Sequence, residues 1–156
     1  MADYGIYWKN FARESNQGDW PCTRWWTNSD RLGRCANGGR LWLFTSGVKC
    51  GMADEKAAYL VELFTVDEVE TDRGGDSGYP AEEFRFLIRG REARCVAVHP
   101  PLSVDDVLRP PEYPVTLPVG TILQSPRKLR EDVLLRLVER PRSERPDLWQ
   151  QLGGEP

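Results

Sequence analysis

The run RLWLFTS (residues 40–46), which follows the turn-forming pair Gly38-Gly39, says most about the fold of this chain. A second run, AAYLVELFTV (residues 57–66), is apolar on nearly both faces of the strand that it predicts. Strands of this kind are covered by side chains on both sides. We therefore predict that both runs are central strands, or staves of a small barrel.

Weaker patterns flank these two strands. Further strands are predicted at residues 4–9 and 121–124, and a hairpin is predicted from residues 84–89 and 94–98 around Gly90-Arg91. Short helices are predicted at residues 29–32, 104–108 and 129–138, whereas residues 10–28 form a long polar loop. The pattern predicts an α+β fold, a small mixed β-barrel with two or three short helices.

Length and composition favour a single domain. With 156 residues, 40% of them hydrophobic, the chain can bury a real core. We place this domain at residues 1–140 and predict that the Pro- and charge-rich residues 141–156 form a loose tail. No apolar run is long enough for a membrane span, and residues 1–4 do not resemble a signal peptide, so we expect a cytoplasmic protein with no membrane partner.

Charge is unevenly distributed along the chain. The net charge is −3, and residues 51–83 carry ten acidic and only two basic side chains. The densest basic cluster is Arg127-Lys128-Leu129-Arg130, in which Arg127 and Lys128 are candidate phosphate contacts. The alternative for this cluster is a solvated helix start.

Metal and catalytic signals are weak. The four cysteines (Cys22, Cys35, Cys50 and Cys95) form no close pair, and His99 is the only histidine, so we predict reduced thiols and no metal site. The sequence contains neither a nucleophile elbow nor a phosphate-binding loop. No cofactor and no catalytic residue are therefore predicted.

Tryptophans gather at the beginning of the chain. Trp8, Trp20, Trp25 and Trp26 lie within the first 26 residues, in a segment that is otherwise polar. Aromatic rings among hydrogen-bonding groups suit a pocket that stacks a flat ligand and reads its edge, and a nucleobase is the commonest ligand of this kind. The alternative is that Trp25 and Trp26 plug the end of a barrel.

Polar residues at predicted strand ends complete this candidate pocket. They comprise Asn10 after the first strand, Phe44 and Ser46 at the end of residues 40–46, and Gln124 and Ser125 after the last strand. Asn28 follows the tryptophan pair directly. In a small barrel such ends can meet at one rim, where they would supply donors and acceptors to a base edge.

The order of several segments resembles a known family. NGGRLWLFTSG, AAYLVELFTVDEVE, PPLSVDDVL and GTILQSPRKL occur in the order found in the EVE domain, a member of the PUA-like superfamily with the ASCH and YTH domains. The resemblance covers roughly residues 4–139. Gly39-Arg40 stands here where the family typically has Gly-Asp.

EVE and YTH relatives bind modified nucleotides in an aromatic cage. The resemblance implies that Trp25 or Trp26 lines such a cage with Phe44, and that Asn10, Ser46 and Gln124 read the base edge. It also implies a nuclease or an RNA-modification enzyme as a partner. The leading hypothesis is a non-catalytic reader of a modified nucleobase in DNA or RNA, which would bind a flipped or single-stranded base.

Two other functions stay open. The first is a small nucleoside or nucleotide hydrolase of the ASCH type, for which Lys9, Lys49 and Glu62 are the nearby candidate bases. The second is a protein-interaction module that uses the acidic middle segment as its contact face.

Overall fold

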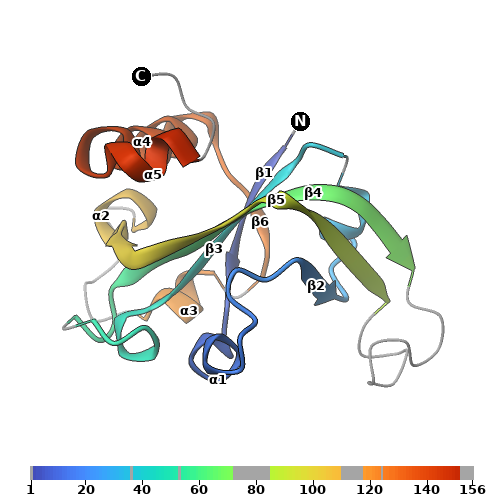
Figure 1. Ribbon diagram of the computed structural model, residues 1–156, viewed down its shortest axis with the longest axis horizontal. Coiled ribbons are helices and arrows are strands. Elements are labelled where there is room, and N and C mark those ends of the chain that lie inside the picture. The colour runs from blue at the N-terminus through green and yellow to red at the C-terminus, as the bar shows by residue number, and fades with distance from the viewer. Residues whose placement is uncertain are drawn as a thin grey trace.

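A single mixed sheet forms the centre of the computed structural model, which describes residues 2–35, 37–52, 54–71, 85–109, 118–123 and 125–151. Its strand order is β2-β5-β4-β3-β1-β6 (Figure 1). The strands are β1 Asp3–Tyr7, β2 Arg24–Thr27, β3 Arg40–Ser46, β4 Ala58–Thr71, β5 Phe86–Ser103 and β6 Arg127–Lys128. The pair β1 and β3 is parallel and the other pairs are antiparallel. The predicted α+β class with a small mixed sheet is confirmed.

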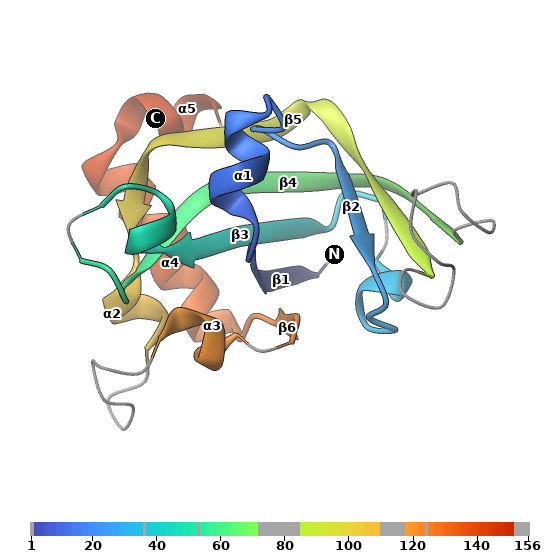
Figure 2. The ribbon, with the colours of Figure 1, turned by 90° about the horizontal axis from the view of Figure 1, so that it is seen from below.

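Short helices cover both faces of this sheet. They are α1 Phe11–Asn16, η1 Leu32–Arg34, η2 Gly47–Lys49, α2 Asp105–Leu108, α3 Val119–Ile122, α4 Glu131–Glu144 and α5 Pro146–Gln151. Figure 1 shows α4 and α5 on one face, with α1 and β2 on the other, and Figure 2 shows α1 and β2 in front of the sheet with α4 behind it. The sheet curls into a half-barrel, and Arg31 Nη1 after β2 reaches the carbonyl oxygen of Pro126 before β6, at 3.2 Å.

The predicted central strands are confirmed, and their alternation explains the two cores. In β3, Leu41 and Leu43 lie in the core cluster on the α1 side, whereas Trp42 and Phe44 lie in the cluster beneath α4 and α5. All four side chains are at most 1% exposed. Because successive strand residues point to opposite faces, an uninterrupted apolar run supplies both cores at once.

The predicted hairpin is wrong. Residues 86–103 form one long strand, β5, whose two parts both pair with β4. The register passes from Val66 opposite Gly90 to Phe64 opposite Cys95, so the four intervening residues of β5 form an exposed excursion. The turn signal at Gly90-Arg91 therefore marks a bulge in one strand and does not reverse the chain.

Two further segments differ from expectation. The supposed loop at residues 10–28 contains α1 and β2, and β2 pairs with β5 through Trp25 opposite Ile88. The predicted strand at 121–124 is wrong, because α3 occupies residues 119–122 and buries Val119 and Ile122. Long-range packing decides both, since the four residues of β2 are held as a strand by pairing with β5.

The C-terminal segment also differs from the expected loose tail. Helix α4 continues to Glu144 across the predicted boundary at residue 140, and α5 follows to Gln151. Leu148 is 2% exposed within the core cluster, and Arg145 donates hydrogen bonds to the carbonyl oxygens of His99 and Pro100 at 2.9 and 2.8 Å. Leu148 and the hydrogen bonds of Arg145 therefore fix α5 against the core.

Candidate functional site

A cavity of about 600 Å³ is lined by residues of β2 and α1. Its walls come from the end of β1, from α1, from the segment that joins α1 to β2, and from the β5 excursion. A volume of 300–1,000 Å³ is typical of ligand pockets. Trp25 and Trp26, the central pair of the sequence-based prediction, both line this cavity.

Edge-to-face contacts hold the aromatic wall in place. Trp25 meets Trp8 at a centroid distance of 5.8 Å and an interplanar angle of 87°, and Trp8 meets Phe11 at 5.1 Å and 80°. Phe11 in turn meets Trp20 at 5.0 Å. Trp8 is only 2% exposed, whereas Trp25 and Trp26 are half-buried. Trp25 therefore rests on a rigid aromatic cluster and keeps part of its ring accessible.

The segment before β2 is anchored along β4. A register irregularity between Leu60 and Glu62 disturbs the β4 ladder, and the Nε1 of Trp20 donates to the carbonyl oxygen of Val61 at 2.7 Å. The backbone amide of Cys22, two residues further on, donates to Glu62 Oε1 at 2.7 Å. These bonds give a polar loop a defined path over the sheet and place Cys22 in the cavity wall.

Charged groups at the cavity are mainly acidic. Glu14, Asp19 and Glu92 supply carboxylates, and Arg24 supplies one guanidinium. Glu14 is oriented by Trp8, whose Nε1 donates to its Oε2 at 2.6 Å. The cavity thus carries more acceptors than donors, and it disfavours an anionic ligand while it suits a neutral group that donates hydrogen bonds.

A buried carboxyl group lies behind the wall. Glu62 is fully buried in β4, and the Cys22 thiol contacts its Oε2 at 3.6 Å. Burial raises the pKa of Glu62 to about 8, although the two hydrogen bonds from Cys22 act in the opposite direction. Burial, and secondly the charge of Glu62, raise the pKa of the Cys22 thiol, so this thiol stays protonated near neutral pH.

Several predicted site residues lie elsewhere. Phe44 is fully buried in the core, and Ser46 is 6% exposed at the end of β3. Asn10 is the N-cap residue of α1, and Asn28 accepts a hydrogen bond from the Arg85 amide at 2.8 Å. Neither these four residues nor the exposed Ser125 line the cavity, and Gln124 lies outside the described residues.

The predicted cations are also separated from the tryptophans. Arg127 and Lys128 line a second cavity, and no described residue lines both cavities. Lys49, a candidate base, donates to the carbonyl oxygen of Lys9 at 2.6 Å, and neither lysine lines the first cavity. Of the three candidate bases, only Glu62 lies next to its wall. A carboxyl group in an otherwise apolar strand was the available sequence signal for this position.

The remaining expectations concern the cysteines, a metal site, the acidic middle segment and membrane spans. All four cysteines are free thiols, and among the described residues no three His, Cys, Asp or Glu side chains gather closely enough to hold a metal ion. Residues 72–83 of the acidic middle segment lie outside the described residues, and within its described part Glu68 and Glu70 form ion pairs with Arg89. In the described part of the chain, no helix has the length and apolar character that crossing a membrane requires.

Comparison with known structures identifies the fold. A serine-to-alanine mutant of the ASCH protein from Zymomonas mobilis matches with a TM-score of 0.52 and 14% identity over 88% of this chain and 95% of its own. A tyrosine-to-phenylalanine mutant of the same protein matches with a TM-score of 0.53 and 16% identity over 89% and 98%. No protein-family model and no curated protein match the sequence.

The chain therefore has an ASCH-like fold, a curled half-barrel of six mixed strands with short helices. The likeness is to the ASCH domain, and the narrower resemblance to EVE domains stays a prediction.

Proposed function

We propose that this protein is a non-catalytic reader of a modified nucleobase in nucleic acid, and that it binds the base in the cavity beside β2. The observation that carries the proposal is the accessible ring of Trp25, which Trp8 holds edge-on in a cavity that Trp26 also lines. A rigid, half-buried indole offers a stacking surface to a flat ligand.

The polar groups indicate which base edge fits. Glu14, Asp19 and Glu92 accept hydrogen bonds, so they suit a base that presents an amino group, while Arg24 can contact a carbonyl oxygen or a phosphate at the rim. The excess of carboxylates favours entry of the neutral base and keeps the phosphates outside the cavity.

The energetics favour a base that is already unpaired. Stacking on one ring contributes about 1–3 kcal/mol, and extrusion of a base from a duplex costs a few kcal/mol. The free energy of stacking on one or two indoles therefore only offsets the cost of extruding the base from the duplex. We expect single-stranded nucleic acid, or a duplex weakened at the modified base, to bind more tightly than an intact duplex.

A titration of the full chain with oligonucleotides tests the proposal. Single strands that differ only in one modified base should differ in affinity, and Trp25→Ala should abolish the difference. Trp149→Ala, a matched change on α5 outside the cavity, should leave it intact. Equal affinity for modified and plain strands in the wild-type protein would contradict the reader function.

The contact between Cys22 and Glu62 favours a second candidate, a hydrolase that acts on acylated or otherwise modified nucleosides. A buried carboxyl with a pKa of about 8 next to a cavity wall is a candidate acid–base group. Incubation of the protein with N-acylated nucleosides tests this alternative. Release of the free acid and the amine, lost on Glu62→Gln, would favour the hydrolase, and no product at high enzyme concentration would exclude it for these substrates.

A further inference from the structure

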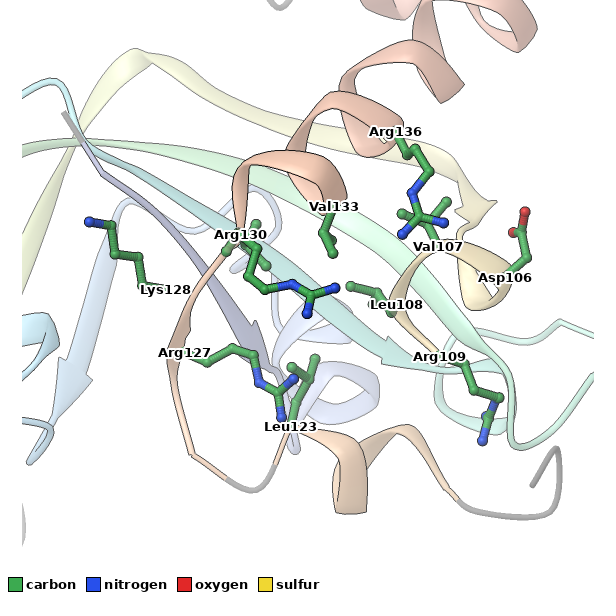
Figure 3. Close-up of a pocket in the computed structure, with 11 residues that line it drawn as sticks. Asp106, Val107, Leu108, Arg109, Leu123, Arg127, Lys128, Arg130, Val133 and Arg136 are labelled. Carbon is green, nitrogen blue, oxygen red and sulfur yellow. The ribbon is translucent and has the colours of Figure 1, made fainter. Parts of the chain in front are cut away.

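A second cavity, of about 300 Å³, lies where α2, β6 and the first turns of α4 meet (Figure 3). Five of its lining residues are arginine or lysine, five are valine or leucine, and one is an acid. This composition is the reverse of the first cavity, where carboxylates prevail. A concave surface that combines several cations with an apolar floor suits an anion that carries an organic body.

The one acid among the described lining residues does not neutralise this charge. Asp106 forms an ion pair with Arg140, which is not part of the lining. Its carboxylate is therefore compensated from outside the cavity. Among the described lining residues, cations therefore outnumber acids by five to one.

Two of the cations are already engaged or turned away. Arg109 is held by Asp105 through hydrogen bonds of 2.9 Å. The ammonium group of Lys128 points away from the other side chains, although the residue lines the cavity (Figure 3). Asp105 therefore largely compensates the charge of Arg109, and Lys128 contributes only to the general positive potential.

Three arginines remain to contact a ligand. Arg127 uses one nitrogen to donate to the Ile122 carbonyl oxygen at 2.8 Å. Within the described residues, the one ion pair of Arg130 is with the exposed Asp132, at 3.2 Å. For Arg136 no hydrogen bond or ion pair is found within the described ranges of the chain. Figure 3 shows the guanidinium group of Arg130 beside Leu108 and below Val133, and that of Arg136 next to Val107. Guanidinium forks of this kind match the oxygens of a phosphate group.

The apolar floor restricts the ligand further. Leu108, Val133 and Leu123 line the same space as the guanidinium groups, and an inorganic anion alone would leave them uncovered. We propose that this cavity binds a small phosphate monoester whose organic part is apolar and compact. The volume is at the lower end of the range for ligand sites, so a single ring fits better than a dinucleotide. The proposal is independent of base reading, because no described residue lines both cavities.

Calorimetric titration of the full chain with three probes tests this site. Phenyl phosphate should bind more tightly than inorganic phosphate, and phenol should not bind. Arg136→Gln should weaken phenyl phosphate binding about tenfold, or about 1.4 kcal/mol, and Arg130→Gln should act in the same direction. Arg142→Gln removes an equal charge from α4 outside the cavity and should leave the affinity unchanged.

Three results would overturn the proposal. They are no binding of phenyl phosphate at low salt, equal weakening by Arg136→Gln and Arg142→Gln, and an affinity for inorganic phosphate that equals that for phenyl phosphate. Thermal unfolding of each variant shows whether it is folded, and a bound ligand should raise the Tm of the wild-type protein but not of Arg136→Gln. If Arg136→Gln did not fold, Arg130→Gln would decide the outcome.

Discussion

The backbone amide of Cys22 donates a hydrogen bond to Glu62 Oε1 at 2.7 Å, across 40 residues of sequence. This bond ties the wall of the first cavity to the centre of the longest antiparallel pair, β4 and β5. A neutral, buried carboxyl group thereby sits directly behind a candidate ligand site. Any change in the charge of Glu62 should therefore alter the position of Cys22 and the stability of the fold.

Stability should depend on pH through Glu62. Burial raises its pKa from 4.5 to about 8 in the folded chain, so between these values the unfolded chain releases a proton that the folded chain keeps. The free energy of unfolding should therefore fall as the pH rises through this window, by at most about 1.4 kcal/mol per unit from this group. Denaturant titrations from pH 5 to 8 should show a flatter profile for Glu62→Gln. Parallel profiles for both proteins would contradict the raised pKa.

Removal of the thiol should shift this profile. The Cys22 side chain and amide both lower the pKa of Glu62 by hydrogen bonding, although burial dominates. Cys22→Ala deletes the thiol contact and keeps the amide, so the pKa of Glu62 should rise further and the loss of stability should extend to higher pH. The same denaturant series measures this, with Cys35→Ala as the control thiol that has no contact with Glu62. A shift toward lower pH would show that the thiol does not stabilise the carboxylate.

Discrimination between bases should depend on the ring at position 25. Trp25→Phe keeps a stacking surface of reduced area and should weaken binding of the modified strand only partly, whereas Trp25→Ala removes the surface and should cost about 1–3 kcal/mol. Fluorescence anisotropy with labelled single strands measures both. Equal losses for the two variants would indicate that Trp25 supports the fold and does not contact the base.

The C-terminal helix should contribute to stability. Leu148 is 2% exposed on α5, so Leu148→Ala should lower the free energy of unfolding by about 2–5 kcal/mol. Leu135→Ala is the matched control, because this leucine on α4 is 65% exposed and its loss should change stability by less than about 0.5 kcal/mol. A small effect at Leu148 would show that the segment behaves as the loose tail that its composition predicted.

Gly90 should tolerate no side chain. A Cβ atom there would lie 2.4 Å from Cys95 Sγ and 2.9 Å from the Phe64 ring, within the β5 bend. Gly90→Ala should therefore destabilise the protein by about 1–3 kcal/mol, and Cys95→Ala in the same chain should restore part of the loss. Denaturant unfolding of the two single variants and the double variant measures the coupling, and strictly additive losses would contradict the contact.

The central strands β3 and β4 could be predicted from sequence because their evidence is local. Leu41 to Phe44 are apolar at every position, a pattern that is typical of a strand covered on both faces. The tryptophan pair could be predicted as part of a pocket for a similar reason, since a polar segment gives indoles no core of their own. The apolar face of residues 129–138 likewise predicts helix α4. It does not predict that this helix extends to Glu144.

The tertiary structure alone decided which segments meet. Gly90-Arg91 is a turn signal, so the sequence predicts a hairpin where the structure has the single strand β5. Only the pairing with β4 shows that both halves of β5 share one partner strand. The separation of Arg127 from Trp25 and the burial of Glu62 under Cys22 depend on how the sheet curls and where its bulges fall. Local sequence sets which face of a strand is apolar, but register, curvature and strand partners arise from contacts between residues far apart in the chain.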